Sequence, residues 1–241
     1  MPDTGFMHFY AEEILIGGVY GHRDEVIAVA EHVAEDRVLQ PFHKLEGKIR
    51  EARRIAVTDC ICRKEARLLG HGCDYPMENC LSFGVAAEYY IDSGMGREIE
   101  AEEALRILKE ADESGLVHAG ANSKHLSNIC NCCPCCCASL KAIVSAGQEK
   151  GSFYNALYEA VIDEEECIAC ESCLERCPVR TIRVEETAIT DRDKCLGCGL
   201  CASVCPSEAI SLHLRPDRQE PFDRVIDMGM VMLEAKKRRI A

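Results

Sequence analysis

Two stretches of sequence decide the fold of this chain: CIACESCLERCPVRTI at residues 167–182 and CLGCGLCASVCPSEAI at residues 195–210. They align without a gap, 28 residues apart, and each contains the spacing C-x2-C-x2-C-x3-C-P. The repeated cysteines are Cys167, Cys170, Cys173 and Cys177, followed by Cys195, Cys198, Cys201 and Cys205. A zinc ribbon would need only paired C-x2-C knuckles. The third and fourth cysteine of each copy are instead typical of iron-sulfur ligation.

This repeat resembles the bacterial-type ferredoxins with two 4Fe-4S clusters, over about residues 160–213. In that family the first three cysteines of a copy bind one cluster, and the fourth binds the other. The resemblance implies these ligand sets: Cys167, Cys170, Cys173 and Cys205 for one cluster, and Cys195, Cys198, Cys201 and Cys177 for the second. The β-prone runs at 160–163 and 210–214 and a hairpin at 182–190 agree with such a domain.

The composition favours metal binding over disulfides. The N-terminal sequence has no basic leader followed by an apolar core, and no run approaches the roughly 18 apolar residues that span a bilayer. We therefore expect a soluble, cytoplasmic protein without a membrane span. In a reducing cytosol, its 18 cysteines are expected to bind metal.

The charge of the chain bears on its partners. With 41 acidic and 28 basic residues, the formal net charge is -13. Nucleic acid is therefore not an expected partner. The acidic balance is favoured as a feature that keeps the protein soluble, and it would also suit a partner with a basic docking face.

Ten further cysteines precede the repeat, in two groups. The first group has the spacing C-x-C-x10-C-x6-C and consists of Cys60, Cys62, Cys73 and Cys80. The second is the run NICNCCPCCC, with Cys130, Cys132, Cys133, Cys135, Cys136 and Cys137. If the strand-like run IAVT continues through Cys62, the thiols of Cys60 and Cys62 project to the same side.

Three interpretations of these ten thiols remain open. We favour one or two additional iron-sulfur clusters, since ten thiols exceed what one four-coordinate site needs. Zinc is less favoured, because the C-x-C and C-C pairs match its usual knuckles poorly. Reactive or unoccupied thiols are the third interpretation. His71 and His125 lie near the cysteines, but a loop role is favoured for both, and Arg63 is expected to donate to a cluster sulfur or to pair with an acid.

The N-terminal pattern CxCR, then CLSFG, then CNCCxCCC resembles a group of multi-cluster ferredoxin-like proteins of anaerobes. That resemblance implies an electron carrier. A weaker similarity links the paired cysteines to the CCG segments of heterodisulfide-reductase-type enzymes, although Pro134 and Ala138 follow the pairs here instead of glycine.

The remaining pattern predicts an α+β fold. Apolar spacing predicts helices at 23–39, 77–94, 102–115 and 138–147, and strands at 53–58 and 115–119. We expect a helical, small-sheet, cysteine-rich domain at 1–157, a pseudo-twofold ferredoxin-like domain at 158–215, and a C-terminal helix with a basic end at 216–241.

The predicted function is transfer of single low-potential electrons between redox partners in an anaerobic pathway. One alternative is an oxidoreductase whose N-terminal cysteines reduce a disulfide or a sulfur compound. Another is a zinc-stabilised scaffold that carries a ferredoxin module. No catalytic residue is assigned, and an electron carrier or a subunit of a larger oxidoreductase complex is favoured over a stand-alone enzyme. The sequence predicts no oligomeric state.

Overall fold

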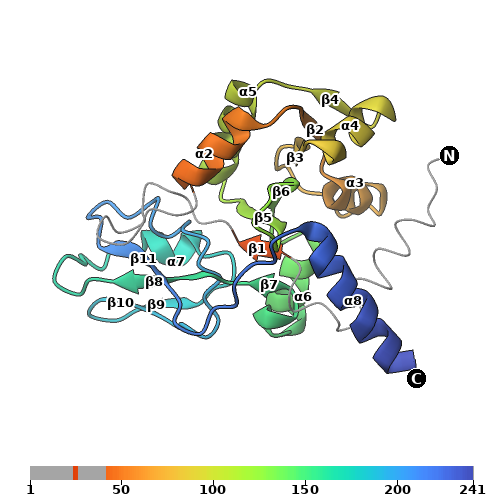
Figure 1. Cartoon of the computed structure of the whole chain (residues 1–241). Coiled ribbons are helices and arrows are strands. Elements are labelled where there is room, and N and C mark those ends of the chain that lie inside the picture. The colour runs from red at the N-terminus through yellow and green to blue at the C-terminus, as the bar shows by residue number, and fades with distance from the viewer. Residues whose placement is uncertain (1–23, 27–41, 241) are drawn as a thin grey trace.

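A seven-stranded sheet forms the centre of the N-terminal part (Figure 1). The computed structural model describes residues 24–26 and 42–240. The strands are β1 (Asp24–Val26), β2 (Ile55–Asp59), β3 (Glu78–Phe83), β4 (Gly96–Glu98), β5 (Val117–Ala121), β6 (Asn128–Cys132) and β7 (Tyr154–Asn155). Their order is β4-β2-β3-β6-β5-β1-β7, and every neighbouring pair is antiparallel except β1 and β7.

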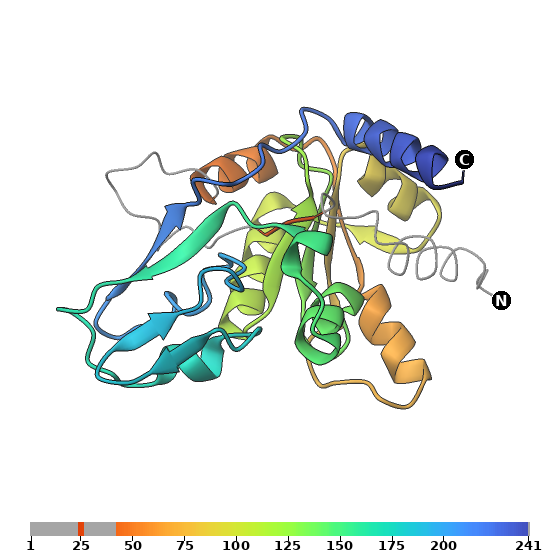
Figure 2. The same ribbon diagram turned by 90° about the horizontal axis from the view of Figure 1, so that it is seen from below.

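Helices lie on both faces of this sheet (Figure 2). They are α2 (Phe42–Glu51), α3 (Ile61–Leu68), α4 (Val85–Asp92), α5 (Ala101–Glu113) and α6 (Ala138–Ala146). On one face, Leu108 of α5 belongs to the same core cluster as Leu81 and Ile129 of the central strands. Because successive strand residues point to opposite faces, the neighbouring Cys80 and Cys130 point away from α5.

The C-terminal part contains the cysteine repeat. Strand β8 (Tyr158–Ile162) pairs antiparallel with β11 (Ile210–Leu214), and β9 (Ile182–Val184) forms a hairpin with β10 (Ala188–Thr190). The short helix α7 (Ser172–Arg176) follows the first cysteine loop. Figure 1 shows these elements together beside the large sheet. The strands expected near 160–163 and 210–214 and the hairpin at 182–190 are confirmed.

The two copies of the repeat share an unusual backbone. Within the described residues, the four non-glycine residues with positive φ all lie in it: Ala169, Glu171, Arg180 and Glu208. Ala169 and Glu171 correspond to Gly197 and Gly199, which also have positive φ, and Arg180 corresponds to Glu208. A side chain at Gly197 would place its Cβ 2.1 Å from the carbonyl oxygen of Tyr158, so this position admits only glycine.

Most of the predicted elements are confirmed, with two exceptions. Strands β2 and β5, helices α5 and α6 and the C-terminal helix α8 (Val225–Ile240) occur where they are expected. The helix predicted at 77–94 is wrong in its first half, because Glu78–Phe83 pairs as β3 with strands on both sides. Most of the helix predicted at 23–39 lies outside the described residues, and Asp24–Val26 is strand β1.

The N-terminal and C-terminal parts share a core. Val117 of β5, Leu140 of α6 and Tyr154 of β7 belong to the same buried cluster as Leu196 and Leu200 from the second cysteine loop. In addition, the guanidinium of Arg176 in α7 donates to the carbonyl oxygens of Asp112 and Glu113 at the end of α5. The packing that joins the parts is therefore both apolar and polar.

Candidate metal centres

The first quartet of the repeat lines one cavity. Cys167, Cys170, Cys173 and Cys205 surround about 310 Å³ of open space. The backbone N–H of Ala188 donates to the Cys167 sulfur at 3.4 Å. Such amide-to-sulfur hydrogen bonds stabilise a negatively charged cluster.

The second quartet lines a separate cavity of similar size, about 330 Å³. Its members are Cys177, Cys195, Cys198 and Cys201. The N–H of Thr181 donates to the Cys177 sulfur at 3.3 Å, and the N–H of Gly197 donates to the Cys195 sulfur at 3.4 Å. Burial raises the pKa of Cys198 to about 12 and also raises the pKa of Cys201. These thiols would therefore be neutral unless a metal ion displaced their protons.

Each cavity thus gathers the four cysteines that the family resemblance assigns to one cluster. The donors suit iron, because thiolates are its usual ligands in 4Fe-4S clusters. The assignment of individual ligands stays a prediction.

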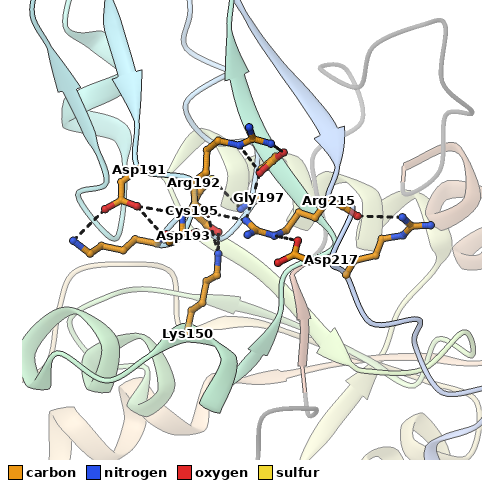
Figure 3. Close-up of polar contacts among 11 residues, drawn as sticks. Lys150, Asp191, Arg192, Asp193, Cys195, Gly197, Arg215 and Asp217 are labelled. Carbon is orange, nitrogen blue, oxygen red and sulfur yellow. Dashed lines mark hydrogen bonds and ion pairs between the residues drawn. The ribbon is translucent and has the colours of Figure 1, made fainter.

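Basic side chains hold the second cysteine loop (Figure 3). The ammonium group of Lys150 donates to the carbonyl oxygen of Cys195 at 2.8 Å and to that of Arg192 at 3.2 Å. Arg215 also donates to the carbonyl oxygen of Arg192, at 2.8 Å. The Arg192 guanidinium forms an ion pair with the buried carboxylate of Glu159 and holds its pKa below the ordinary value. Lys150 therefore brings positive charge from the N-terminal part close to a predicted cluster ligand.

Six of the ten N-terminal cysteines form a second kind of centre, which we call the six-thiol ring. Its members come from four elements: Cys60 and Cys62 from the start of α3, Cys80 from β3, Cys130 and Cys132 from β6, and Cys137 from the start of α6. Electrostatic interactions between neighbouring thiols run in the order Cys60, Cys62, Cys137, Cys132, Cys130, Cys80 and back to Cys60.

These contacts make the acidity of the thiols alternate around the ring. The interaction with its neighbour Cys62 lowers the pKa of Cys60, and the interaction with Cys132 lowers the pKa of Cys130 and of Cys137. The pKa of each intervening thiol is raised by the same kind of contact. None of the six is exposed. The ring is thus a closed, largely buried set of sulfur donors.

The starts of α3 and α6 and the register between β3 and β6 bring the thiols of this ring together. The predicted strand ends at Asp59 instead of continuing through Cys62, because Cys60 is the N-cap of α3. The thiols of Cys60 and Cys62 still meet, since both lie at that helix start. Cys137 is likewise the N-cap of α6. The pairing of Leu81 with Ile129 places Cys80 opposite Cys130 across β3 and β6.

The other four N-terminal cysteines form a compact set, which we call the four-thiol group. It consists of Cys73, Cys133, Cys135 and Cys136, whose sulfurs all lie within 4.8 Å of one another. Cys73 therefore lies with three cysteines of the second sequence group and apart from Cys60, Cys62 and Cys80, the other members of the first group. Neither His71 nor His125 belongs to this group.

Arg63 lies between the two N-terminal centres. Its side chain is 1% exposed and donates to the carbonyl oxygens of Pro76 and Asn131, both at 2.6 Å, and to Oδ1 of Asn79 at 2.8 Å. Although burial lowers the pKa of Arg63, the thiols of Cys60 and Cys133 raise it above its ordinary value. The hydrogen bonds of Arg63 thus go to oxygen atoms, and its donation to a cluster sulfur stays a prediction.

Sequence reasoning missed three parts of these centres. It did not divide the ten thiols into six and four, and it did not identify Lys150. It also missed Tyr154, whose hydroxyl lies 3.7 Å from the Cys137 sulfur. The division depends on the register of β3 and β6, on the starts of α3 and α6 and on the loop that contains Cys73, and these become visible only in the folded chain.

Comparison with known proteins gives a family match for the C-terminal part. Residues 160–212 match the family described as the 4Fe-4S dicluster domain. No curated protein matches the chain. Among the described helices, none is long and apolar enough to cross a membrane. Residues 160–212 are a 4Fe-4S ferredoxin-type domain, and the chain has an iron-sulfur electron-transfer role.

Proposed function

We propose that this chain carries single low-potential electrons between redox partners in an anaerobic pathway, through two 4Fe-4S clusters in residues 158–215 and a further iron-sulfur cluster in the N-terminal domain at 1–157. The first quartet and the second quartet each hold one of the two clusters, and the six-thiol ring holds the further one. When bound, each cluster accepts and releases one electron at a time. The residues at 216–241 form a separate C-terminal helix in this proposal.

One observation carries this proposal. Cys137 of the six-thiol ring and Cys198 of the second quartet belong to the same buried core cluster, together with Leu196 and Leu200. A packed apolar contact excludes water and holds two centres at a fixed separation. An electron can therefore pass between the N-terminal centre and the ferredoxin-type domain without leaving the protein.

The chain's own residues have three tasks in this function. The thiolates fix the irons, and the amides of Thr181, Ala188 and Gly197 donate to sulfur and so favour the reduced, more negative state. Burial of the cysteines excludes solvent. No proton needs to move on a side chain, because the transfer involves electrons alone.

The same burial argues against a substrate reaction at the six-thiol ring. A disulfide or sulfur substrate would have to reach a sulfur atom, yet Cys60 and Cys137 are buried and the other four are only half-buried. A redox protein, in contrast, needs only close approach. The net charge of -13 suits a partner with a basic docking face.

A pair of variants tests the ligand sets. Cys198→Ala should lose about four iron and about four sulfide per chain, together with one reduced-cluster signal in electron paramagnetic resonance, and Cys170→Ala should lose the other signal. Ser203→Ala, in the same loop as Cys198 but not a ligand, should retain both. Retention of both signals in Cys198→Ala would refute the assignment, and circular dichroism would identify a variant that had simply unfolded.

A further inference from the structure

The four-thiol group is packed more tightly than the other cysteine sets. The sulfur of Cys73 lies 3.5 Å from that of Cys136 and 4.0 Å from that of Cys133. All four sulfurs lie within 4.8 Å of one another, and no other set of three or more thiols, imidazoles or carboxylates in the described residues is gathered in this way.

These separations match one metal ion. A zinc-thiolate bond is about 2.3 Å long, so four sulfurs in a tetrahedron around one ion lie about 3.8 Å apart. In a 4Fe-4S cluster each thiolate binds a different iron, and the four sulfurs must lie further apart. The repeat provides an internal comparison, because neither of its quartets brings its four sulfurs within 4.8 Å of one another. The sulfur separations of the four-thiol group therefore suit a smaller centre than a 4Fe-4S cluster.

The surrounding charge also points to a metal thiolate. Arg63 is 1% exposed, and its Nε has no hydrogen-bond partner among the described nitrogen and oxygen atoms. Its guanidinium lies beside Cys133 of the four-thiol group. A divalent ion with four thiolates carries a charge of about -2, so a buried cation beside it offsets part of the cost of burying that charge.

The position of the group suggests what the ion would do. Cys73 lies in the loop between α3 and β3, whereas Cys133, Cys135 and Cys136 lie in the turn between β6 and α6. Cys133 and Cys136 are buried with Ala66 of α3 in one core cluster. An ion at this point would tie both loops together directly beside the elements that carry the six-thiol ring.

We propose that Cys73, Cys133, Cys135 and Cys136 bind a single tetrahedral metal ion, with zinc as the expected occupant, in a structural site separate from the iron-sulfur clusters. The sequence favours one or two additional iron-sulfur clusters among the ten N-terminal cysteines, and this proposal assigns four of those cysteines to a metal ion instead. All four ligands come from the chain, which is the closed form that structural zinc sites take. The proposal does not depend on the occupant of the six-thiol ring.

Metal and sulfide analysis of the full chain, purified without oxygen, tests this site. We expect about one zinc per chain in the parent protein. Cys135→Ser, which changes the exposed member of the group, should lose that zinc while iron and acid-labile sulfide stay unchanged. The matched control Cys132→Ser, in the six-thiol ring, should lose iron and sulfide but keep zinc. A single iron without sulfide in place of zinc would also support one tetrahedral ion.

Equal loss of iron and sulfide in Cys135→Ser would overturn the proposal, as would a parent protein with no metal ion outside its clusters. Cobalt exchange gives a second measurement that requires no variant. Cobalt in place of zinc should give the visible absorption of a tetrahedral four-thiolate complex, and its absence would count against the site. If the chain bound zinc at these four cysteines but had no clusters in the repeat, the result would contradict the proposed function and would still support the zinc site.

Discussion

Cys137, at the start of α6, and Cys198, in the second cysteine loop of the ferredoxin-type domain, lie in one buried core cluster. The six-thiol ring therefore borders the second quartet through packed side chains. The hydroxyl of Tyr154, 3.7 Å from the Cys137 sulfur, belongs to the same cluster. The N-terminal part and the ferredoxin-type domain therefore share one core, and this core contains a thiol of the six-thiol ring and a thiol of the second quartet.

Arg63→Met should destabilise the N-terminal part. The change removes a buried cation that faces the thiols and leaves the carbonyl oxygens of Pro76 and Asn131 without their donor. Loss of one partner of a buried charge pair costs about 3 kcal/mol or more of unfolding free energy. Denaturant titration without oxygen measures this. Arg67→Met, an exposed position on the same helix, should change the free energy by less than about 0.5 kcal/mol. Equal effects of the two changes would contradict the role assigned to Arg63.

Gly197→Ala and Gly147→Ala form a matched pair, because both glycines have positive φ, +67° and +65°. At Gly147 a Cβ meets nothing within 4 Å, so we expect only the left-handed backbone cost of about 1 kcal/mol. At Gly197 the Cβ would lie 2.1 Å from the Tyr158 carbonyl oxygen, and a loss of about 3 kcal/mol or more is expected, together with loss of the second quartet's cluster. Thermal unfolding and iron content check both. If Gly197→Ala changed neither the unfolding free energy nor the iron content, the close packing of this loop against Tyr158 would be contradicted.

His118 should make stability fall in mildly acidic solution. Burial lowers its pKa in the folded protein, where Nδ1 lies 2.6 Å from Oδ1 of Asn131. As the pH falls through the ordinary histidine pKa near 6.5, the unfolded chain binds a proton first. Stability is therefore fully present above this pH and decreases below it, by up to about 1.4 kcal/mol per pH unit. His118→Gln should flatten the unfolding free energy between about pH 7 and pH 5. An unchanged slope in that variant would contradict this.

Lys150→Met should lower the reduction potential of the second quartet's cluster. Lys150 contributes a positive charge at the carbonyl group of Cys195, and a nearby cation favours the reduced cluster. We expect a shift on the order of tens of millivolts for that cluster alone. Lys194→Met is the control, because Lys194 is exposed and forms an ion pair with Asp191. A redox titration followed by electron paramagnetic resonance distinguishes the two clusters. Equal shifts of both clusters, or none, would argue against this role for Lys150.

The sequence predicts the C-terminal part well because its information is local. The spacing of the repeat is enough to propose the two quartets, and the β-prone runs around it become β8 and β11. Helices α5 and α6 also follow from apolar spacing and from Gly115 and Gly147, which end them with positive φ.

The N-terminal centres could not be predicted because their information is not local. Cys80 meets Cys130 only through the register of β3 and β6, and this depends on a strand that the helical spacing of 77–94 obscures. Cys73 lies between Cys62 and Cys80 in sequence, yet its loop carries it to Cys133 and Cys136. The cysteines of each run therefore divide between two sites according to the fold, which spacing alone does not specify.

The most direct test of the electron-transfer account is a reductive titration of the full chain, purified without oxygen, that counts the electrons taken up from a reduced viologen dye. Two clusters in the ferredoxin-type domain and one in the six-thiol ring predict at least about three electrons per chain, and an ion in the four-thiol group contributes none if it is zinc. Cys132→Ser should remove the contribution of the ring and leave about two. An uptake of two electrons or fewer by the parent protein, unchanged in Cys132→Ser, would contradict an electron path through the N-terminal part.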